Sequence, residues 1–386
     1  MRKTILGFII TLFSLALVMG YANAGQRCDV CHTMHNSQGG VPMNFDASAT
    51  PNPALLRGAC LGCHGDTTAN TIKTITAGTI PQVFNSVGGT TDPGANNSVT
   101  GPTVNLAGGN FYYVKATGTA ATDDPKGHNV DVITGVSGDG VLGNIPPGYA
   151  STYDPATTKY SANFRLTCAG SNGCHGNRNI ARSGFQTGVA ASLAALQGAH
   201  HEDDTPPKLD GSTVGRSYRF LNGILGLEDA NWQQSASASD HNEYEGDTTQ
   251  GTNTHTISYL CANCHGNFHR VIGTASPWLR HPTDTDTIGK GGGYAKYNDI
   301  VSAGNPYSIE APVGYDGTGL QAGIPASPRA TVLTGQSIVL CISCHRAHAT
   351  PNDDILRWSY ATMQAGGGGA NGTGCFRCHT ALDGTP

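Results

Sequence analysis

Cysteine and histidine recur together at six places in this 386-residue chain, and these places account for all 12 cysteines. Five have two residues between the cysteines and a histidine directly after the second cysteine. The third in chain order, Cys168/Cys174/His175, has five residues between its cysteines. This spacing lets two thiols form thioethers with a porphyrin while the histidine binds its iron. The sequence therefore predicts six covalently attached haems c, the other five at Cys28/Cys31/His32, Cys60/Cys63/His64, Cys261/Cys264/His265, Cys341/Cys344/His345 and Cys375/Cys378/His379.

Two other uses of cysteine explain the pattern less well. Disulfides suit an exported chain with an even number of cysteines, but they do not require a histidine after every second cysteine. Zinc sites need about four converging ligands each, whereas successive motif histidines stand 32, 111, 90, 80 and 34 residues apart. At Cys168/Cys174 the insert must bulge away from the porphyrin so that both sulfurs reach their vinyl groups. We expect a haem there too, because no other cysteine remains as a partner.

Each haem iron needs a second axial ligand, which is normally histidine or methionine. The only methionines beyond residue 24 are Met34, Met43 and Met363, which are too few for six haems. Nine of the 15 histidines remain once six are assigned as proximal ligands. The sequence therefore predicts bis-histidine ligation at all six irons.

The position of a spare histidine indicates which haem it serves. His35 and His348 each stand three residues after a proximal histidine, and His269 stands four residues after His265. Because the proximal histidine occupies the near face of its own haem, none of the three easily reaches the far face. We expect each to bind a neighbouring haem, which would clamp two porphyrins near contact.

The remaining histidines fall into two groups. His241 and His255 are more simply explained as structural or surface side chains. The adjacent His200 and His201 are expected to donate one ligand, and the sequence does not decide between them. The predicted distal ligands are thus His35, His128, His269, His281, His348 and one of the pair His200 and His201.

Residues 1–24 have the features of an export signal. Arg2 and Lys3 precede an apolar stretch over residues 5–19, and Ala22-Asn23-Ala24 supplies a cleavage site of small residues. The apolar stretch is short for a membrane span, which needs about 20 residues, so we expect cleavage rather than an anchor. No later segment is apolar enough to cross a bilayer. The sequence predicts a signal peptide over 1–24 and one hexahaem domain over 25–386, exported through the periplasm.

The composition limits which partners and which folds are possible. The net charge of −5 becomes −7 once the two cations of the signal are removed, and no basic patch exists to neutralise the phosphates of a nucleic acid. Glycine is abundant, with 53 residues, and periodic apolar runs are few. We therefore expect mostly coil with few short helices and strands, organised around a chain of six haems. Short helices are predicted over 185–197 and 353–364, and a strand over 111–114.

Around five of the predicted haem or ligand positions the sequence is distinctive beyond the attachment signal itself. These stretches are Cys28–Gly40, Lys126–Asn129, Cys261–His269, Leu279–Pro282 and Cys341–Ala349. In them the chain resembles the filament-forming multihaem cytochromes of metal-reducing bacteria. The resemblance implies subunits joined head to tail into a wire with a continuous haem stack and little regular secondary structure. It also implies that His35 binds a haem of the adjacent subunit.

Three functions are compatible with these residues to different degrees. Extracellular electron transfer by a polymerised cytochrome at the outer cell surface, towards other cytochromes or extracellular metal oxides, fits best. A monomeric periplasmic or surface electron shuttle is the alternative. A multihaem reductase needs an iron with an open position, whereas all six motifs end in histidine and spare histidines outnumber the irons. We therefore expect an electron carrier rather than an enzyme.

The number of attached haems tests the weakest motif. Intact-protein mass spectrometry of the mature chain should return six haem masses on a polypeptide that starts at Gly25. Alkaline pyridine haemochrome quantitation provides an independent count. A mass that corresponds to five haems would rule out attachment through Cys168 and Cys174.

Overall fold

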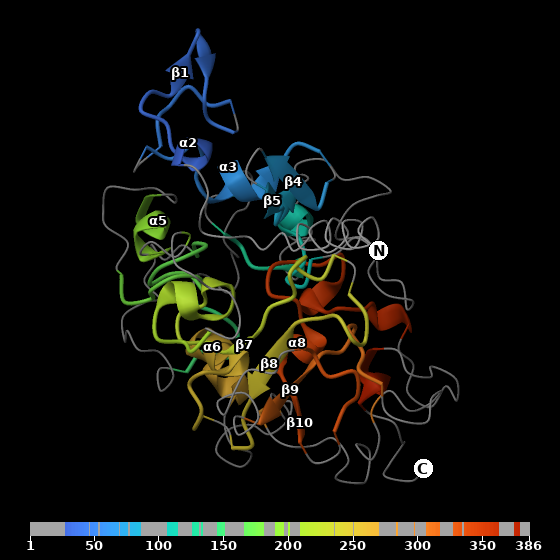
Figure 1. The fold of residues 1–386 in the computed structure, drawn as a ribbon. Coiled ribbons are helices and arrows are strands. Elements are labelled where there is room, and N and C mark those ends of the chain that lie inside the picture. The colour runs from blue at the N-terminus through green and yellow to red at the C-terminus, as the bar shows by residue number, and fades with distance from the viewer. Residues whose placement is uncertain are drawn as a thin grey trace, which may run out of the picture.

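Short helices and strands are separated by long irregular connections throughout the described part of the chain (Figure 1). The computed structural model describes residues 28–45, 47–52, 55–68, 70–75, 78–85, 106–114, 126–130, 133, 145–150, 166–180, 190–196, 200, 209–234, 236–249, 251–269, 283–284, 297, 306–316, 327–333, 336–362 and 374–378. The predicted signal peptide, His201, His281 and His379 lie outside these ranges. Mostly coil with few short helices and strands is the architecture that the composition predicts.

The helices are short, and most of the α-helices carry a cysteine motif. The α-helices of the described residues are α2 (Cys28–Cys31), α3 (Cys60–His64), α5 (Ala190–Leu196), α6 (Ile257–His265) and α8 (Cys341–Cys344). The 3₁₀ helices are η2 (Phe111–Val114), η5 (Val214–Arg216), η6 (Tyr218–Phe220), η7 (Gly266–His269), η10 (Asp353–Ile355), η11 (Tyr360–Thr362) and η12 (Gly374–Arg377). Within the described ranges, no helix has the length and apolar character that crossing a membrane requires.

The strands form one four-stranded sheet and three small pairs. The sheet has the order β10-β9-β8-β7, with β8 and β9 parallel and both outer pairs antiparallel. Its strands are β7 (Gly226–Leu227), β8 (Glu243–Gly246), β9 (Val313–Asp316) and β10 (Ser337–Val339). The pairs are β1 (Ser37–Gln38) with β2 (Val41–Pro42), β3 (Gly65–Asp66) with β6 (Phe84–Asn85), and β4 (Ile72–Ile75) with β5 (Gly78–Pro81).

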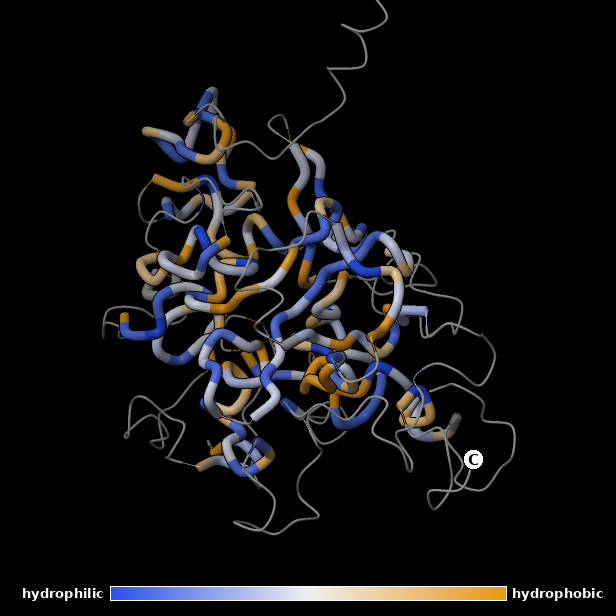
Figure 2. Tube along the Cα trace, turned by 60° about the horizontal axis from the view of Figure 1, so that its bottom comes forward, coloured by the Kyte–Doolittle hydropathy of each residue, from blue (hydrophilic) through white to orange (hydrophobic). Residues whose placement is uncertain are grey.

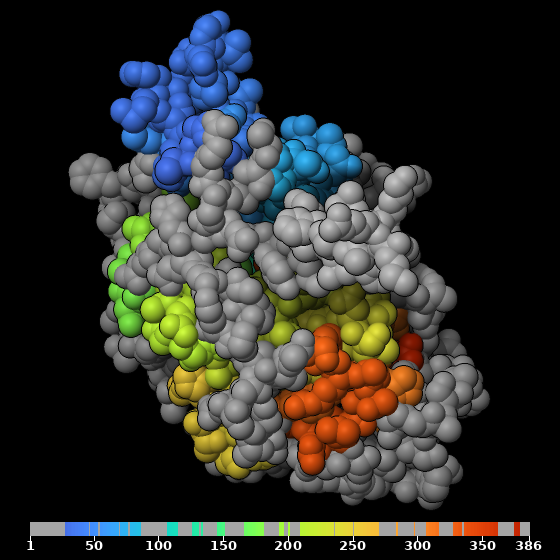
Figure 3. Space-filling view, viewed as in Figure 1, coloured from blue at the N-terminus to red at the C-terminus, as the bar shows by residue number. Residues whose placement is uncertain are grey.

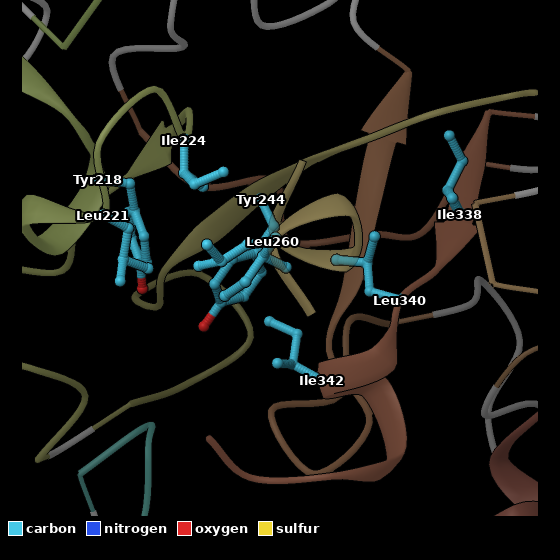
Figure 4. Close-up of a cluster of buried hydrophobic side chains, with 9 residues drawn as sticks. Tyr218, Leu221, Ile224, Tyr244, Leu260, Ile338, Leu340 and Ile342 are labelled. Atoms are coloured by element: carbon cyan, nitrogen blue, oxygen red, sulfur yellow. The ribbon is translucent and has the colours of Figure 1, made fainter. Parts of the chain in front are cut away.

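The four-stranded sheet supports the fourth and fifth cysteine motifs. In one apolar cluster, side chains of the sheet and of residues 218–224, which precede β7, pack against α6 and α8. Figure 4 shows Tyr244 of the sheet with Leu260 of α6 and Ile342 of α8. Helix α6 begins where the Oγ1 of Thr256 accepts a hydrogen bond from the backbone N–H of Tyr259, at 3.0 Å. Burial of this cluster therefore fixes both motif helices relative to the sheet. The cluster comprises Tyr218, Leu221, Ile224, Tyr244, Ile257, Leu260, Ile338, Leu340 and Ile342.

Apolar residues are otherwise distributed in small groups along the chain (Figure 2). A second cluster, around Tyr307 and Trp358, has the partly buried Cys344 and Cys378 packed against it. A third cluster, around Phe111 and Val114, has Cys168 packed against it. Motif cysteines thus line the apolar clusters, which is where large apolar prosthetic groups would be buried.

The arm, defined as segment 28–57, projects from the rest of the molecule (Figures 1 and 3). It is closed on itself by backbone hydrogen bonds from Thr33 to Leu55 and from Arg57 to Cys31, both 2.8 Å. Its apolar side chains are unusually open to solvent, with Met34 77% and Val41 63% exposed.

The expected local structure is confirmed in part. A helix does form within 185–197, as α5. The 353–364 segment forms two separate 3₁₀ turns, η10 and η11, rather than one helix. The predicted strand over 111–114 is wrong, because this segment is the 3₁₀ helix η2. There the side-chain Oδ1 of Asn110 accepts the backbone N–H of Tyr112 at 2.9 Å, which starts a helical turn and overrides the β propensity of the aromatic residues.

The core around the sheet can be tested by truncation of Leu340, which is fully buried. Leu340→Ala should lower the free energy of unfolding by about 2–5 kcal/mol, because it leaves a cavity beside β9. Leu333→Ala is the matched control, since Leu333 is 38% exposed, and it should change stability by only about 0.5 kcal/mol. Guanidinium unfolding followed by circular dichroism measures both. Equal effects of the two variants would contradict the assignment of the core.

Candidate haem sites

The cysteines predicted to attach haem all lie in described ranges, and none of the 12 forms a disulfide. Attachment through a thioether stays a prediction for every one of them. Three of the thiols belong to exposed residues, Cys28, Cys31 and Cys174. The other nine are half-buried: Cys60, Cys63, Cys168, Cys261, Cys264, Cys341, Cys344, Cys375 and Cys378.

The second cysteines of the second and fourth motifs, Cys63 and Cys264, are held by their helices. In α3 the N–H of Cys63 donates to the carbonyl of Ala59 at 3.0 Å, and its own carbonyl accepts the Nε2–H of Gln82 at 3.2 Å. Cys264 lies in the last turn of α6, directly before His265. Both positions agree with a haem motif. We therefore keep Cys63 and Cys264 as predicted attachment sites on their spacing alone.

The same backbone hydrogen bond is found within the regular and the irregular cysteine motifs. In the regular first and fifth motifs the histidine N–H donates to the carbonyl of the first cysteine, from His32 to Cys28 at 2.8 Å and from His345 to Cys341 at 3.0 Å. The irregular third motif keeps this bond, from His175 to Cys168 at 3.0 Å. The number of residues between the cysteines therefore does not change how the histidine is held.

The insert of the third motif forms a compact loop that makes this possible. The N–H of Gly173 donates to the carbonyl of Gly170 at 2.9 Å, and Gly170 has a φ of +86°. Glycine adopts this left-handed conformation without steric cost. The loop therefore returns Cys174 beside Cys168, as a five-residue bulge requires.

Motif histidines orient their rings through backbone carbonyls. A carbonyl oxygen can only accept, so the Nδ1 atom that contacts it carries the proton, and Nε2 is left with a lone pair for a metal. Four motif histidines have this contact. The Nδ1–H groups of His64, His175, His265 and His345 donate to the carbonyls of Pro81, Arg219, Pro147 and Asp354, at 2.9, 2.9, 2.7 and 2.8 Å.

Three of these motif histidines face a second imidazole across a gap of nearly constant width. The ring centroids are 6.4 Å apart for His64 and His200, 6.3 Å for His175 and His348, and 6.2 Å for His265 and His128. Two imidazoles that bind one metal from opposite sides, each through a bond of about 2 Å, have ring centroids about 6 Å apart. All three pairs therefore fit the axial ligands of a haem iron.

The second members of two pairs are oriented in the same way. The Nδ1–H of His128 donates to the carbonyl of Ala347 at 2.9 Å, and that of His348 donates to the carbonyl of Gly109 at 3.2 Å. Burial, together with neighbouring histidines, lowers the pKa of His348 to about 3 and that of His128 to about 4. Both rings are therefore neutral at physiological pH, which is the state that binds iron.

Thiols of different motifs also meet. The Cys60 and Cys168 side chains share a hydrogen bond, which lowers the pKa of Cys60 and raises that of Cys168. Cys261 and Cys341 share another, which raises the pKa of Cys261 and lowers that of Cys341. The second motif thus lies against the third, and the fourth lies against the fifth.

Two arginines near the fifth motif carry charge into the interior. Arg357 is 8% exposed, and its Nε–H donates to the carbonyl of Ile342 at 2.6 Å. Burial and the charge of Arg357 lower the pKa of Arg346 to about 9. Neither makes an ion pair with a carboxylate of the described residues, and a buried cation needs a counter-charge. The two propionates that a haem carries fit this requirement.

The other predicted distal ligands have different surroundings. His35 is exposed on the arm. The Nε2 of His269 lies 2.7 Å from a carboxylate oxygen of Asp284, and both side chains are 1% exposed. Whether His35 and His269 bind iron stays a prediction, and His201, His281 and His379 lie outside the described ranges.

The two histidines interpreted as structural are held by protein groups. His241 is 1% exposed and stacks on Tyr307, with centroids 3.6 Å apart and planes at 9°. Its Nδ1–H donates to the carbonyl of Ser237 at 3.0 Å. The Nδ1–H of His255 donates to the carbonyl of Gly223 at 2.6 Å.

Sequence reasoning missed the carbonyl acceptors and the buried arginines. A carbonyl has no sequence signature, so Pro81, Pro147 and Arg219 could not be recognised before the fold was known. Arg346 did carry a signal, since it stands between two histidines that are predicted to bind iron, His345 and His348. A cation at this position is compatible with the propionates that a haem carries.

Comparison with known proteins places the chain in a family. The doubled CXXCH motif family matches residues 331–384, which hold the last two motifs. The curated C-type cytochrome OmcS of Geobacter sulfurreducens is 32% identical over 375 residues, covering 87% of this chain and 79% of that protein. The chain belongs to the OmcS family of c-type cytochromes. Members of this family bind haem c through such motifs and act in electron transport.

Two solved structures of the OmcS family are also similar to the chain. One is described as the outer membrane cytochrome S filament from Geobacter sulfurreducens, with a TM-score of 0.43, 23% identity, and 88% of this chain and 85% of that chain covered. The other is described as the OmcS nanowires from the same organism. Its TM-score is 0.39, with 23% identity and coverage of 86% and 83%.

Proposed function

We propose that the chain is a six-haem cytochrome that polymerises outside the cell and conducts electrons along its haems. The observation that carries this proposal is the set of three imidazole pairs spaced at 6.2–6.4 Å. In this proposal His200 and His64 bind the second haem, His348 and His175 the third, and His128 and His265 the fourth. A haem iron supplies the chemistry by gaining and losing one electron. The twelve cysteines attach the haems covalently.

Contacts between the motifs support a continuous order of haems. The thiol contact of Cys60 with Cys168 would bring the edges of the second and third haems together, and that of Cys261 with Cys341 the edges of the fourth and fifth. His128 and His348, proposed ligands of the fourth and third haems, are hydrogen-bonded through their backbones at 3.0 Å. With haems at these positions, such contacts would let electrons pass from haem to haem without a soluble carrier.

The two ends of this series lie at the two ends of the chain. In the arm the backbone of Arg57 is bonded to Cys31 at 2.8 Å, and the second motif begins three residues later at Cys60. At the other end, Cys344 and Cys378 pack against the same apolar cluster. The first haem would therefore adjoin the second, and the fifth would adjoin the sixth.

The arm supports assembly between subunits. His35 is exposed there beside Met34, which is 77% exposed, and the family resemblance assigns this position to a haem of the adjacent subunit. A head-to-tail contact that repeats without closing produces a filament. We propose that the subunits self-associate in this way at the outer cell surface, after export through the periplasm, and deliver electrons to other cytochromes or extracellular metal oxides.

The proposed ligand of the second haem can be distinguished from its sequence neighbour. His200→Ala should convert one of the six irons to a high-spin state, because it removes one axial nitrogen. His201→Ala should leave all six irons low-spin, and so should His255→Ala as a control. Electron paramagnetic resonance of the oxidised holoprotein measures the spin states. A high-spin iron in the His201 variant alone would reverse the assignment.

Assembly is tested at His35. His35→Ala should abolish filaments and leave one haem per subunit without its sixth ligand, because the ligand is supplied across the interface. His255→Ala, a histidine outside the arm whose Nδ1–H donates to the carbonyl of Gly223, is the matched control and should keep both filaments and six low-spin irons. Electron microscopy with electron paramagnetic resonance measures the two properties. Normal filaments in the His35 variant would refute ligation across the interface, and wild-type particles that stay monomeric would favour the shuttle.

A further inference from the structure

Three segments that are far apart in the sequence meet at one small backbone junction. Segment 346–350 lies between segments 106–110 and 126–130. On one side the N–H of His348 donates to the carbonyl of Gly108 at 2.7 Å, and the N–H of Asn110 donates to that of Ala349 at 3.2 Å. On the other side the N–H of His128 donates to the carbonyl of His348 at 3.0 Å. The junction thus uses the backbone of the middle segment on both sides.

The junction also orients two imidazoles. The ring of His128, on one outer segment, donates from Nδ1 to the carbonyl of Ala347 on the middle segment. The ring of His348, on the middle segment, donates from Nδ1 to the carbonyl of Gly109 on the other outer segment. A change in the spacing of the three segments would therefore turn both rings at once.

Glycines on the outer segments allow the backbones to come this close. A Cβ atom at Gly108 would lie 2.9 Å from the Nδ1 of His348. A Cβ atom at Gly127 would collide with the Cβ of Ala349 and lie 2.8 Å from the carbonyl oxygen of His348. A Cβ atom at Gly109 would collide with the carbonyl oxygen of Ala349, and Gly109 has a φ of +82°. No other residue type satisfies all these positions.

We propose that this glycine-lined junction fixes the geometry between the third and fourth haems, with Gly109 and Gly127 as positioning residues for the distal ligands His348 and His128. The inference rests on the proposed assignment of these histidines. The short backbone bond between them sets the separation of the two irons, and the ring bonds set the orientation of each imidazole. Both quantities govern electron exchange between neighbouring haems.

Two ligand variants first identify the spectroscopic signals of the third and fourth haems. His348→Ala and His128→Ala should each produce one high-spin iron in the electron paramagnetic resonance spectrum of the holoprotein, and each identifies the low-spin signal that is lost. If neither variant changes the spectrum, the ligand assignment itself fails.

The positioning role is then tested with Gly127→Ala. This variant should change the two marked signals together, by shifted g-values or partial conversion to high spin, and should leave the other four signals unchanged. Gly246→Ala is the steric control, because its Cβ would lie 2.9 Å from the Cβ of Ile338 in the sheet core. It should lower stability without moving the marked signals. Ala349→Gly, which removes the atom met most closely, should partly rescue the Gly127 variant.

A second variant covers the case in which the Gly127 protein does not accumulate. Gly109→Ala should give the same paired change, with Gly223→Ala as its control, since Gly223 has a φ of +85° and open space around it. Unchanged third and fourth haem signals in a folded Gly127 or Gly109 variant would overturn the proposal. So would equal changes at all six haems, because these would indicate a general loss of structure.

Discussion

One hydrogen bond, from the Nδ1–H of an imidazole to a backbone carbonyl, determines how this chain presents its candidate iron ligands. It fixes the tautomer, because the acceptor has no proton to give, and it fixes the direction in which Nε2 points. The bond recurs at four motif histidines and at two histidines that are paired with them. His241 and His255 make it too, so the second imidazole about 6 Å away is what distinguishes the candidate ligands. An imidazole held in this way is ready for a metal before the metal arrives, so little ordering is needed when it binds.

Some of these hydrogen bonds join segments that are far apart in the sequence. The acceptor carbonyls come from remote segments, such as Pro147 for His265 and Ala347 for His128, which are 118 and 219 residues away in sequence. Pro147 and Ala347 lie in irregular backbone, whereas the other acceptors, Pro81, Arg219 and Asp354, lie in β5, η6 and η10. Both irregular connections and short elements therefore supply acceptors, while helices such as α6 and α8 carry the cysteines.

Local chemistry could be predicted from the sequence, and long-range pairing could not. The cysteine motifs and the abundance of histidine over methionine lie within short stretches or simple counts, so they indicated haem c and histidine ligands directly. The partner of a given motif histidine depends on segments such as that around His200, whose approach to His64 has no local signal. The strand prediction for Phe111–Val114 was wrong for a different reason. There a hydrogen bond to the side chain of Asn110 outweighed the β propensity of the segment.

The loop between Cys168 and Cys174 bears on how haem motifs are counted in genome sequences. Its histidine makes the same bond to the first cysteine as the regular motifs do, at 3.0 Å, so the number of intervening residues is not the property that matters. What matters is whether the chain can return to the first cysteine, and a glycine-containing loop of variable length can do this. Searches with a fixed two-residue spacing find five motifs in this chain and miss one. If Cys168 and Cys174 attach a haem as proposed, haem inventories built on that pattern are lower bounds.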